Sequence, residues 1–361
     1  MKITMAHGSG GQSSAQLMKD IFGKYFNNEI LGRMEDAAVL EVGRPMAGAD
    51  AGAAAGADIN TAAGTDISTA VGGAAGGPVR IACSTDSFVV TPLEFKGGDI
   101  GKLCVCGTVN DLLMMGAVPK YLTCGFILEE GLDIDLLDRL VASMAKQARE
   151  AGVAIVAGDT KVVEGDGGLY INTTGIGEIP AGRDVSSSNG KPGDVIIVSG
   201  NLGDHHACIL SHRMEIENEI VSDCAALNDV VDALFAAGID VHTMRDVTRG
   251  GLGTVINEIA GSSGVRIELE EEAIPVHADV KGFADILGLD PLYMGNEGKM
   301  IAVVPADQAD AALAAMRRTE HGKDAVLIGQ LLEGSGVYLK TRLGATRRFD
   351  VLYGEGLPRI C

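Results

Sequence analysis

Apolar residues along the chain follow two spacings, one typical of strands and one typical of amphipathic helices. Helical spacing is clearest over residues 134–147, where leucines and other apolar residues recur every three to four positions before Gly152. A second helix is predicted after Gly97-Gly98, with Asn110-Asp111 placed among its apolar positions. Short apolar runs predict strands, and in this half of the chain they fall at residues 35–40, 79–83, 120–128, 153–157 and 169–179. The strand at 153–157 is predicted to be buried.

The same alternation continues in the second half of the chain. Strands are predicted at residues 194–199, 266–269, 299–304 and 324–331, and helices at 230–237, 252–260 and 307–316. The turn-rich, polar segment from Pro180 to Gly193 separates the two halves. We therefore predict an N-terminal domain at residues 1–182, a C-terminal α/β domain at 183–342 and a mobile tail at 343–361.

One segment breaks the pattern. Residues 44–78 are dominated by Gly, Ala, Asp and Thr and contain few large apolar side chains. Such a composition cannot bury enough surface to fold by itself. We predict a low-complexity insertion in a loop between two strands of the N-terminal domain.

Composition and charge narrow the function classes. The chain carries 49 Asp and Glu against 29 Lys and Arg, a net charge of −20, so nucleic acid is not an expected partner. The apolar runs fall short of the roughly 18 residues that a membrane helix needs, so no membrane association is expected. The N-terminus lacks the pattern of a signal peptide, and most cysteines lie in apolar surroundings, so we expect a cytoplasmic protein.

Carboxylates recur beside glycine or Ser/Thr turns that adjoin apolar elements. Asp36, Asp86, Asp111 and Asp159 share this context, and Asp246 repeats it in the C-terminal domain. Each one alone could be a helix cap or a turn residue. Together they are typical of a site in which Mg²⁺, which prefers oxygen ligands, bridges nucleotide phosphates.

Two glycine-rich loops could supply backbone N–H groups to phosphate. His7-Gly-Ser-Gly-Gly11 precedes an amphipathic helix, and Asp246-Val-Thr-Arg-Gly-Gly251 opens another. A loop followed by a helix presents free N–H groups to an anion, although a flexible start before a helix cap would look the same. The sequence contains no Walker A motif and no kinase signature.

Three residues are the candidates for chemistry. Lys161 and Glu297 each lie beside glycine at the end of a predicted strand, and an enclosed carboxyl can act as a base. A surface ion pair is the alternative for both. Cys361 follows Gly354-Glu-Gly-Leu-Pro on a segment unsuited to a regular helix or strand. Extended from Leu343, that arm would reach about 60 Å, so its thiol could act as a carrier.

These motifs, taken in order, resemble the HypE family of hydrogenase maturation proteins, which are carbamoyl dehydratases. The resemblance rests on nearly the whole chain, through His7-Gly-Ser-Gly-Gly, Glu35-Asp-Ala-Ala, Ser84-Thr-Asp-Ser, Gly107-Thr-Val-Asn-Asp, Cys124-Gly-Phe-Ile-Leu-Glu-Glu-Gly, Gly158-Asp-Thr-Lys-Val-Val, Asp246-Val-Thr-Arg-Gly-Gly, Asn296-Glu-Gly-Lys and Pro358-Arg-Ile-Cys. The family is similar to aminoimidazole ribonucleotide synthetase, selenophosphate synthetase and thiamine monophosphate kinase.

The resemblance implies a fold and a reaction. An α+β N-terminal domain would pair with a second copy to close a β-barrel in a homodimer, with ATP near that interface. A carbamoyltransferase would load a carbamoyl group on Cys361, and ATP would drive its dehydration to a thiocyanate. The cyano group would then pass to an iron on the scaffold complex that builds the [NiFe]-hydrogenase centre.

The resemblance also assigns residues. Cys361, Glu297 and Lys161 are predicted to be catalytic, and Mg²⁺ is expected on Asp36, Asp86, Asp111, Asp159 and Asp246. The predicted ATP-binding residues are Gly8, Ser9, Gly10, Gly11, Asp86, Asn110, Asp159, Thr248, Arg249 and Gly250. The insertion at residues 44–78 is not expected from the family pattern.

Three alternatives remain open from the sequence. A selenophosphate synthetase would need a reactive Cys or selenocysteine in the N-terminal glycine loop, which has none. A nucleotide-binding scaffold would bind ATP without turnover and would tolerate Cys361→Ala. A redox sensor would need a partner thiol for Cys361.

Overall fold

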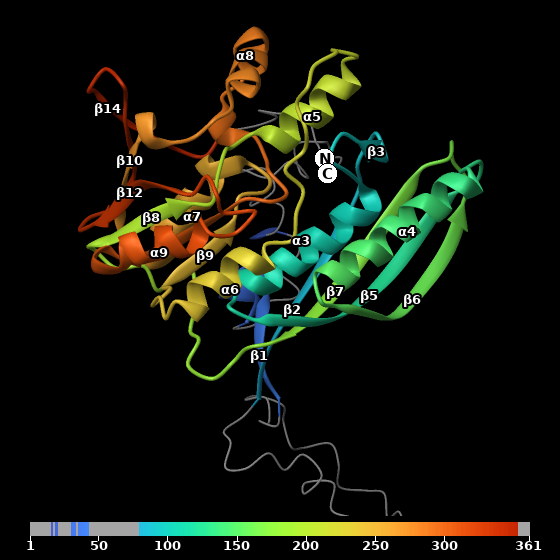
Figure 1. The fold of residues 1–361 in the computed structure, drawn as a ribbon, viewed down its shortest axis with the longest axis horizontal. Helices are drawn as coiled ribbons and strands as arrows, with labels where there is room; N and C mark the ends of the chain where they lie inside the picture. The colour runs from blue at the N-terminus through green and yellow to red at the C-terminus, as the bar shows by residue number, and fades with distance from the viewer. Residues whose placement is uncertain (1–15, 17–18, 21–29, 34, 43–78, 353–361) are drawn as a thin grey trace, which may run out of the picture.

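The computed structural model describes residues 16, 19–20, 30–33, 35–42 and 79–352, and it shows two domains that lie side by side (Figure 1). Three predicted features lie outside the described residues. They are the loop Gly8–Gly11, the low-complexity segment 44–78 and Cys361.

The N-terminal domain is a sheet with helices on one face. Its described strands run in the order β1-β2-β7-β5-β6, and every pair is antiparallel except β5 and β6. Helices α3 and α4 pack on one face of this sheet, and a small β3–β4 ribbon precedes α3 (Figure 1). The bounds are β1 Ala38–Val42, β2 Val79–Phe88, β3 Glu94–Phe95, β4 Gly98–Asp99, α3 Ile100–Met114, β5 Val118–Glu129, α4 Ile134–Glu150, β6 Ala154–Val163 and β7 Leu169–Glu178.

Local sequence explains where the two helices of this domain begin. Asp99 and Asp133 precede α3 and α4, and each carboxylate accepts a backbone N–H of the first turn, at 2.9 and 2.8 Å. Helix α4 is amphipathic and buries only one face. Helix α3 is buried on nearly all sides, because the sheet covers one face and the C-terminal domain another.

The C-terminal domain is built on a larger mixed sheet. Its described strands run in the order β14-β13-β10-β12-β8-β11-β9, with β10 and β13 the parallel pair. The bounds are β8 Asp194–Val198, α5 Asp204–Arg213, α6 Asn228–Ala236, β9 Thr243–Asp246, α7 Gly251–Ser263, β10 Arg266–Glu270, α8 Ala278–Leu287, β11 Met300–Pro305, α9 Ala309–Met316, β12 Val326–Leu332, β13 Gly336–Lys340 and β14 Thr346–Arg348. Short 3₁₀ turns lie at Leu31–Arg33, Glu271–Ala273, Pro291–Tyr293 and Ala306–Gln308.

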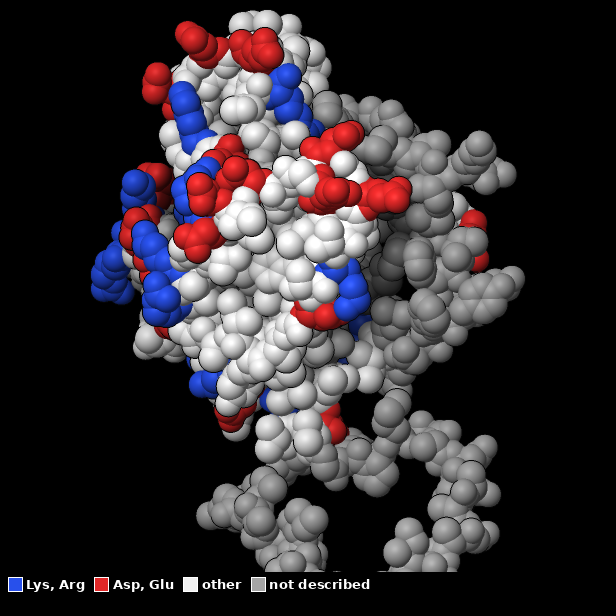
Figure 2. Space-filling view, turned by 90° about the vertical axis from the view of Figure 1, so that its right-hand side faces the viewer, with Lys and Arg blue, Asp and Glu red and all other residues white. Residues whose placement is uncertain are grey.

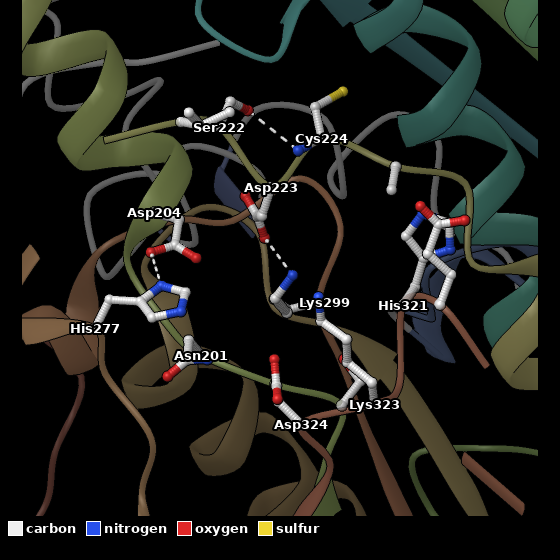
Figure 3. Close-up of a pocket in the computed structure, with 15 residues that line it drawn as sticks. Asn201, Asp204, Ser222, Asp223, Cys224, His277, Lys299, His321, Lys323 and Asp324 are labelled. Carbon is white, nitrogen blue, oxygen red and sulfur yellow. Dashed lines mark hydrogen bonds and ion pairs between the residues drawn. The ribbon is translucent and has the colours of Figure 1, made fainter. Parts of the chain in front are cut away.

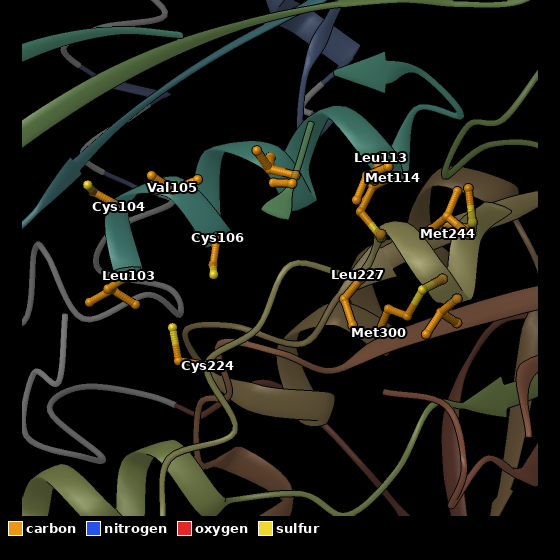
Figure 4. Close-up of a cluster of buried hydrophobic side chains, with 14 of the residues drawn as sticks. Leu103, Cys104, Val105, Cys106, Leu113, Met114, Cys224, Leu227, Met244 and Met300 are labelled. Atoms are coloured by element: carbon orange, nitrogen blue, oxygen red, sulfur yellow. The ribbon is translucent and has the colours of Figure 1, made fainter. Parts of the chain in front are cut away.

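A shared core joins the domains. Figure 4 shows Leu103, Cys106 and Met114 of α3 facing Leu227 and Cys224 of the C-terminal domain. The buried side-chain amide of Asn110 adds hydrogen bonds to this contact. The Asn110 side chain donates to Ala225 O at 3.0 Å and accepts from Leu227 N at 2.9 Å. The two domains are therefore fixed to each other by packing and by hydrogen bonds that leave the amide of Asn110 satisfied.

Two expectations are corrected here. The strand predicted as buried at residues 153–157 is β6, the edge strand of the sheet, and every residue of β6 is exposed in this chain. The tail predicted from residue 343 begins later. Strand β14 pairs with β13, and Phe349 is fully buried against Tyr293, so residues up to Asp350 belong to the C-terminal domain.

The described sheet of one chain stays open and does not close into a barrel. Among the described residues, we find no helix with the length and apolar character needed to cross a membrane.

Candidate active site

Four of the predicted aspartates meet where the domains face each other. Asp36 lies just before β1, and Asp86 lies on β2. Asp111 is in helix α3, and Asp246 ends strand β9. Helix α3 packs across β2 on one side and against β9 on the other, which brings the four carboxyls together. Electrostatic interactions link them: the pKa of the Asp111 carboxyl is raised by burial first, then by Asp246, Asp86 and Asp36.

Arg245 ties this cluster to both domains. Its Nε lies 2.6 Å from Asp36 Oδ1, and its Nη2 lies 2.7 Å from Glu258 Oε2. Another guanidinium nitrogen donates to Ser187 Oγ at 3.2 Å, and Glu35 accepts from Ser187 N and Oγ. The segment around Ser187, which connects the two domains, is thereby held to the residues just before β1.

Burial raises the pKa of every carboxyl in the cluster. The pKa of Asp246 is about 6, raised by burial and by Asp86 and lowered by Arg245. The pKa of Asp36 lies well above its usual value, because burial outweighs the attraction of Arg245. The pKa of Asp86 is also raised by burial, and Arg249 opposes that shift. Crowding and burial both disfavour the charged form of these carboxyls, and a bound cation would favour it.

Glu297 lies beside this cluster and is 5% exposed. The segment that carries it runs next to the end of β9: Asn296 N donates to Val247 O at 3.0 Å, and Val247 N donates to Lys299 O at 2.8 Å. Burial raises the pKa of Glu297 well above its usual value, and Asp246, Asp223 and Asp86 raise it further. A raised pKa makes the Glu297 carboxylate a stronger proton acceptor than an exposed one, which suits a general base.

The N-terminus of α7 provides a second feature of the site. Gly250 and Gly251 have φ angles of 80° and 59°, and they connect Asp246 to the first turn of the helix. A Cβ at Gly251 would lie 2.7 Å from Met294 O, so the backbone approach requires glycine. Thr248 is half-buried and Arg249 exposed at this helix start. Free N–H groups and a guanidinium here suit a phosphate.

Two predicted site residues lie elsewhere in the chain. Asp159 and Lys161 are on β6, with side chains 71% and 68% exposed, and they form an ion pair of 2.6 Å. Lys161 is not among the charged groups that shift the pKa of Glu297. The strand order explains the separation, because β7 and β5 lie between β6 and the strand that carries Asp86. Within one chain, the predicted pairing of Lys161 with Glu297 is not formed.

The structure also adds residues that the sequence did not single out. Arg245 pairs with Asp36, and Asp223 contacts the backbone of Glu297. The position of Arg245 beside the predicted Asp246, on the short strand β9, was the available signal. Asn110 was predicted to bind nucleotide. In the structure its side-chain amide makes the hydrogen bonds of the domain contact described above.

The chemistry of the cluster fits a divalent cation. Asp36 Oδ2 is buried and has no hydrogen-bond partner in the described part of the chain, and the neighbouring carboxyls raise one another's pKa. A cation would relieve both. The described residues contain no group of three or more Asp, Glu, His or Cys side chains that could hold an ion by themselves. Mg²⁺ usually binds through one or two carboxylates together with water and the phosphates of a nucleotide.

Comparisons with known proteins cover both domains. Residues 34–179 match the family described as AIR synthase related protein, N-terminal domain, and residues 191–342 match the corresponding C-terminal domain. The chain is 44% identical over 370 residues to "Carbamoyl dehydratase HypE" of Rhodobacter capsulatus, covering 100% of this chain and 98% of the relative.

Solved structures give the same result. The chain superposes on a "Hydrogenase Maturation Protein HypE in complex with ATP" with a TM-score of 0.76 and 44% identity, over 100% of both chains. It also superposes on a chain of a "HypE-HypF complex" with a TM-score of 0.80 and 41% identity, over 93% of this chain and 99% of that chain.

Proposed function

Because the chain belongs to the HypE family of carbamoyl dehydratases, we propose that it dehydrates an S-carbamoyl group on Cys361 to a thiocyanate, using ATP. The product would supply the cyano ligand for the iron of the [NiFe]-hydrogenase active site. The observation that carries the proposal is the position of Glu297, a buried carboxyl with a raised pKa beside the aspartate cluster and near the glycine start of α7.

The proposed reaction has two steps. The carbamoyl oxygen attacks the γ-phosphate of ATP, forming a C–O–P linkage and releasing ADP, and one nitrogen proton is lost. The C–O bond then breaks and phosphate leaves, while the second nitrogen proton is removed to give S–C≡N. The carbamoyl group loses the elements of one water, which appear in the hydrolysis of ATP to ADP and phosphate. Phosphorylation is needed because an amide oxygen is a poor leaving group.

We assign the described residues as follows. Glu297 accepts a proton from the carbamoyl nitrogen, a role that suits a buried carboxyl with a raised pKa. The Thr248-Arg249-Gly250 turn holds phosphate oxygens at the start of α7. Asp36, Asp86, Asp111 and Asp246 would hold Mg²⁺, which offsets phosphate charge when it is bound. Gly8, Ser9, Gly10 and Gly11 remain proposed phosphate contacts outside the described residues.

We further propose that the protein is a homodimer. Large apolar side chains of the N-terminal sheet are left exposed by the described residues: Tyr121, Ile127, Ile155, Val156, Val162, Val163 and Ile176. The side of the molecule shown in Figure 2 carries a broad central area without charged side chains. Exposed apolar side chains concentrated on one sheet are typical of an interface, and pairing two open sheets would close the barrel that the family resemblance implies.

A dimer also explains the position of Lys161. If β6 of one subunit packs against the other subunit, Lys161 and Asp159 can complete the other subunit's site, which contains Glu297 and the aspartate cluster. These two residues would then act between subunits. Lys161 would hold a phosphate or the Glu297 carboxylate there, and Asp159 would contribute to the nucleotide or its Mg²⁺.

The proposed partners follow from the chemistry of a carrier thiol. A carbamoyltransferase would load Cys361, and a structural neighbour is a chain of a HypE–HypF complex. A scaffold complex that holds the iron would accept the cyano group. We place these exchanges in the cytoplasm, where reducing conditions keep a carrier thiol free.

The experiment follows the mass of the peptide that contains Cys361. The protein is incubated with its carbamoyltransferase, carbamoyl phosphate and Mg²⁺·ATP, and samples are taken over time. We expect a carbamoyl adduct that forms first and then loses about 18 Da, the mass of one water. Cys361→Ala should abolish both masses while ATP still binds.

A nucleotide-binding scaffold is the competing interpretation. It would show an unmodified Cys361 peptide and ATP binding without turnover. That result, with an active carbamoyltransferase in the same mixture, would overturn the dehydratase proposal.

A further inference from the structure

Asp223 lies directly beneath the segment that carries Glu297. Its Oδ1 accepts the N–H of Glu297 at 3.2 Å, and its Oδ2 accepts the N–H of Gly298 at 3.3 Å. One carboxylate therefore holds two consecutive backbone groups. The contact is close on the backbone as well, because a Cβ at Gly298 would lie 1.9 Å from Asp223 O.

Further bonds fix the same segment from both sides. Ala225 N donates to Glu297 O at 3.3 Å, and Asn296 Oδ1 accepts from Gly203 N at 2.8 Å. The backbone around Glu297 is thus held to two loops of the C-terminal domain. Among these contacts, only the two made by Asp223 involve a charged side chain. They hold the backbone of Glu297 and Gly298.

Lys299 compensates the charge of Asp223. Its Nζ lies 3.5 Å from Asp223 Oδ2 and also donates to Gly298 O at 3.2 Å. The Asp223 side chain is 2% exposed and that of Lys299 is 14% exposed. A buried carboxylate persists only when hydrogen bonds and a counter-charge replace its water, and here two N–H groups and one ammonium do so.

The pair closes one end of a polar cavity. Figure 3 shows Asp223 and Lys299 pointing toward each other at its wall, with Asp204 and His277 on one side. The cavity has a volume of about 330 Å³ and is also lined by Lys323 and Asp324. Lys299 therefore meets water on one side and Asp223 on the other, while Glu297 faces the aspartate cluster.

We propose that Asp223, held by Lys299, is a positioning residue that aims the Glu297 carboxyl at the reacting nitrogen. The inference rests on the proposed role of Glu297 in the dehydratase reaction. Asp223 acts through the backbone of residues 297 and 298 and touches no substrate. Loss of its charge leaves the two N–H groups without a matched acceptor, since an amide presents one oxygen and one competing donor.

The test compares single turnovers of the carbamoylated protein. Asp223→Asn should lower the rate of thiocyanate formation at least tenfold at saturating ATP and leave the Kd for ATP within about twofold, because misplacing a catalytic group costs rate rather than binding. Lys299→Met should lower the rate in the same direction, and Lys299→Arg should restore most of it. Lys323→Met removes a lysine from the same cavity and serves as the matched control, with an unchanged rate.

A double-mutant cycle separates positioning from general damage. In a Glu297→Gln background, adding Asp223→Asn should lower the residual rate no further, because Asp223 acts only through Glu297. Equal additional loss in both backgrounds overturns the inference. If Asp223→Asn does not fold, the Lys299 variants decide by the same criterion.

The outcomes also separate this inference from the function on which it rests. A strongly impaired Glu297→Gln together with fully active Asp223→Asn and Lys299→Met overturns only the positioning role. A fully active Glu297→Gln overturns the assigned role of Glu297 and this inference with it.

Discussion

At the residue scale, one buried histidine, His206, makes the free energy of unfolding depend on pH. His206 on α5 is 2% exposed, and its Nε2 has no hydrogen-bond partner in the described structure. Burial lowers the pKa of His206 to about 3, with smaller contributions from His205 and Arg213. The unfolded chain takes up this proton near pH 6.5, so the free energy of unfolding falls as the pH drops from there toward 3.

We expect His206 to contribute a loss of about 2 kcal/mol between pH 7 and pH 5. Urea unfolding of His206→Leu and the parent protein at both pH values measures it, and the variant should lose less. His212→Leu is the control, because His212 is exposed on the same helix. Equal losses for all three proteins would contradict the prediction.

Asp246 gives a shift of the opposite sign. Its pKa of about 6 in the folded chain exceeds the unfolded value, so its contribution to stability is present at low pH and is lost as the pH rises through 6. Without Mg²⁺, at pH 7.5, we expect Asp246→Asn to be more stable than the parent by about 1–3 kcal/mol.

Thermal and urea unfolding in EDTA and in Mg²⁺·ATP measure this difference. Mg²⁺·ATP should stabilise the parent more than the variant, since the variant lacks one proposed ligand. Asp310→Asn, at an exposed position of α9, should change neither value. A destabilised Asp246→Asn in EDTA would show that the cluster is not electrostatically strained.

Single residues also show the reach of sequence interpretation. Asp36, Asp86, Asp111, Asp246 and Glu297 were singled out because each lies in a turn or helix context with its own local signature, and the structure brings them together. Asp223 has no such signature. Its importance depends on Glu297, 74 residues later in the chain, and local patterns carry no information on such a contact.

At the scale of elements, the N-terminus of α7 gives the clearest test. A Cβ at Gly251 would strike Met294 O at 2.7 Å and would need a φ of 59°, so Gly251→Ala must displace the helix start. We expect ATP affinity to fall at least tenfold, because the N–H groups lose their alignment with the phosphates. Calorimetry with a non-hydrolysed ATP analogue measures the change.

The same helix provides the matched control. A Cβ at Gly261 would meet nothing within 4 Å, and its backbone is helical. Gly261→Ala should raise stability by about 0.5–1 kcal/mol and leave ATP affinity unchanged. Equal ATP affinity for both variants would remove α7 from the proposed phosphate site.

Elements with a strong period were predicted correctly, and the failures have physical causes. Helix α4 and strands β7, β8 and β11 lie close to the predicted residues because their apolar positions follow a single spacing. Helix α5 was not predicted, because Asp204-His205-His206 is polar although the structure buries it. Strand β6 was predicted to be buried because its residues are apolar, and none of the described residues covers them.

At the scale of the whole molecule, that uncovered strand is the reason to expect a second copy. Val162 on β6 is 69% exposed, and Val162→Glu should convert the dimer to a monomer, because a charge cannot be buried unpaired in an interface. Light scattering after size exclusion measures the mass. Ile286→Glu on α8, at a position 82% exposed, is the control and should stay dimeric. A parent protein that is monomeric at micromolar concentration would contradict the proposal.

The dimer makes a sharper prediction about catalysis, since Lys161 and Glu297 would meet only between subunits. Lys161→Ala and Glu297→Gln should each retain only a small residual activity alone. When the two variants are unfolded, mixed in equal amounts and refolded together, half of the dimers are hybrids, and each hybrid has one intact site. Activity should recover to about a quarter of the parent value. If both residues served one chain's own site, every hybrid site would carry a lesion and no activity would return, so the recovery measures directly whether the active site is shared.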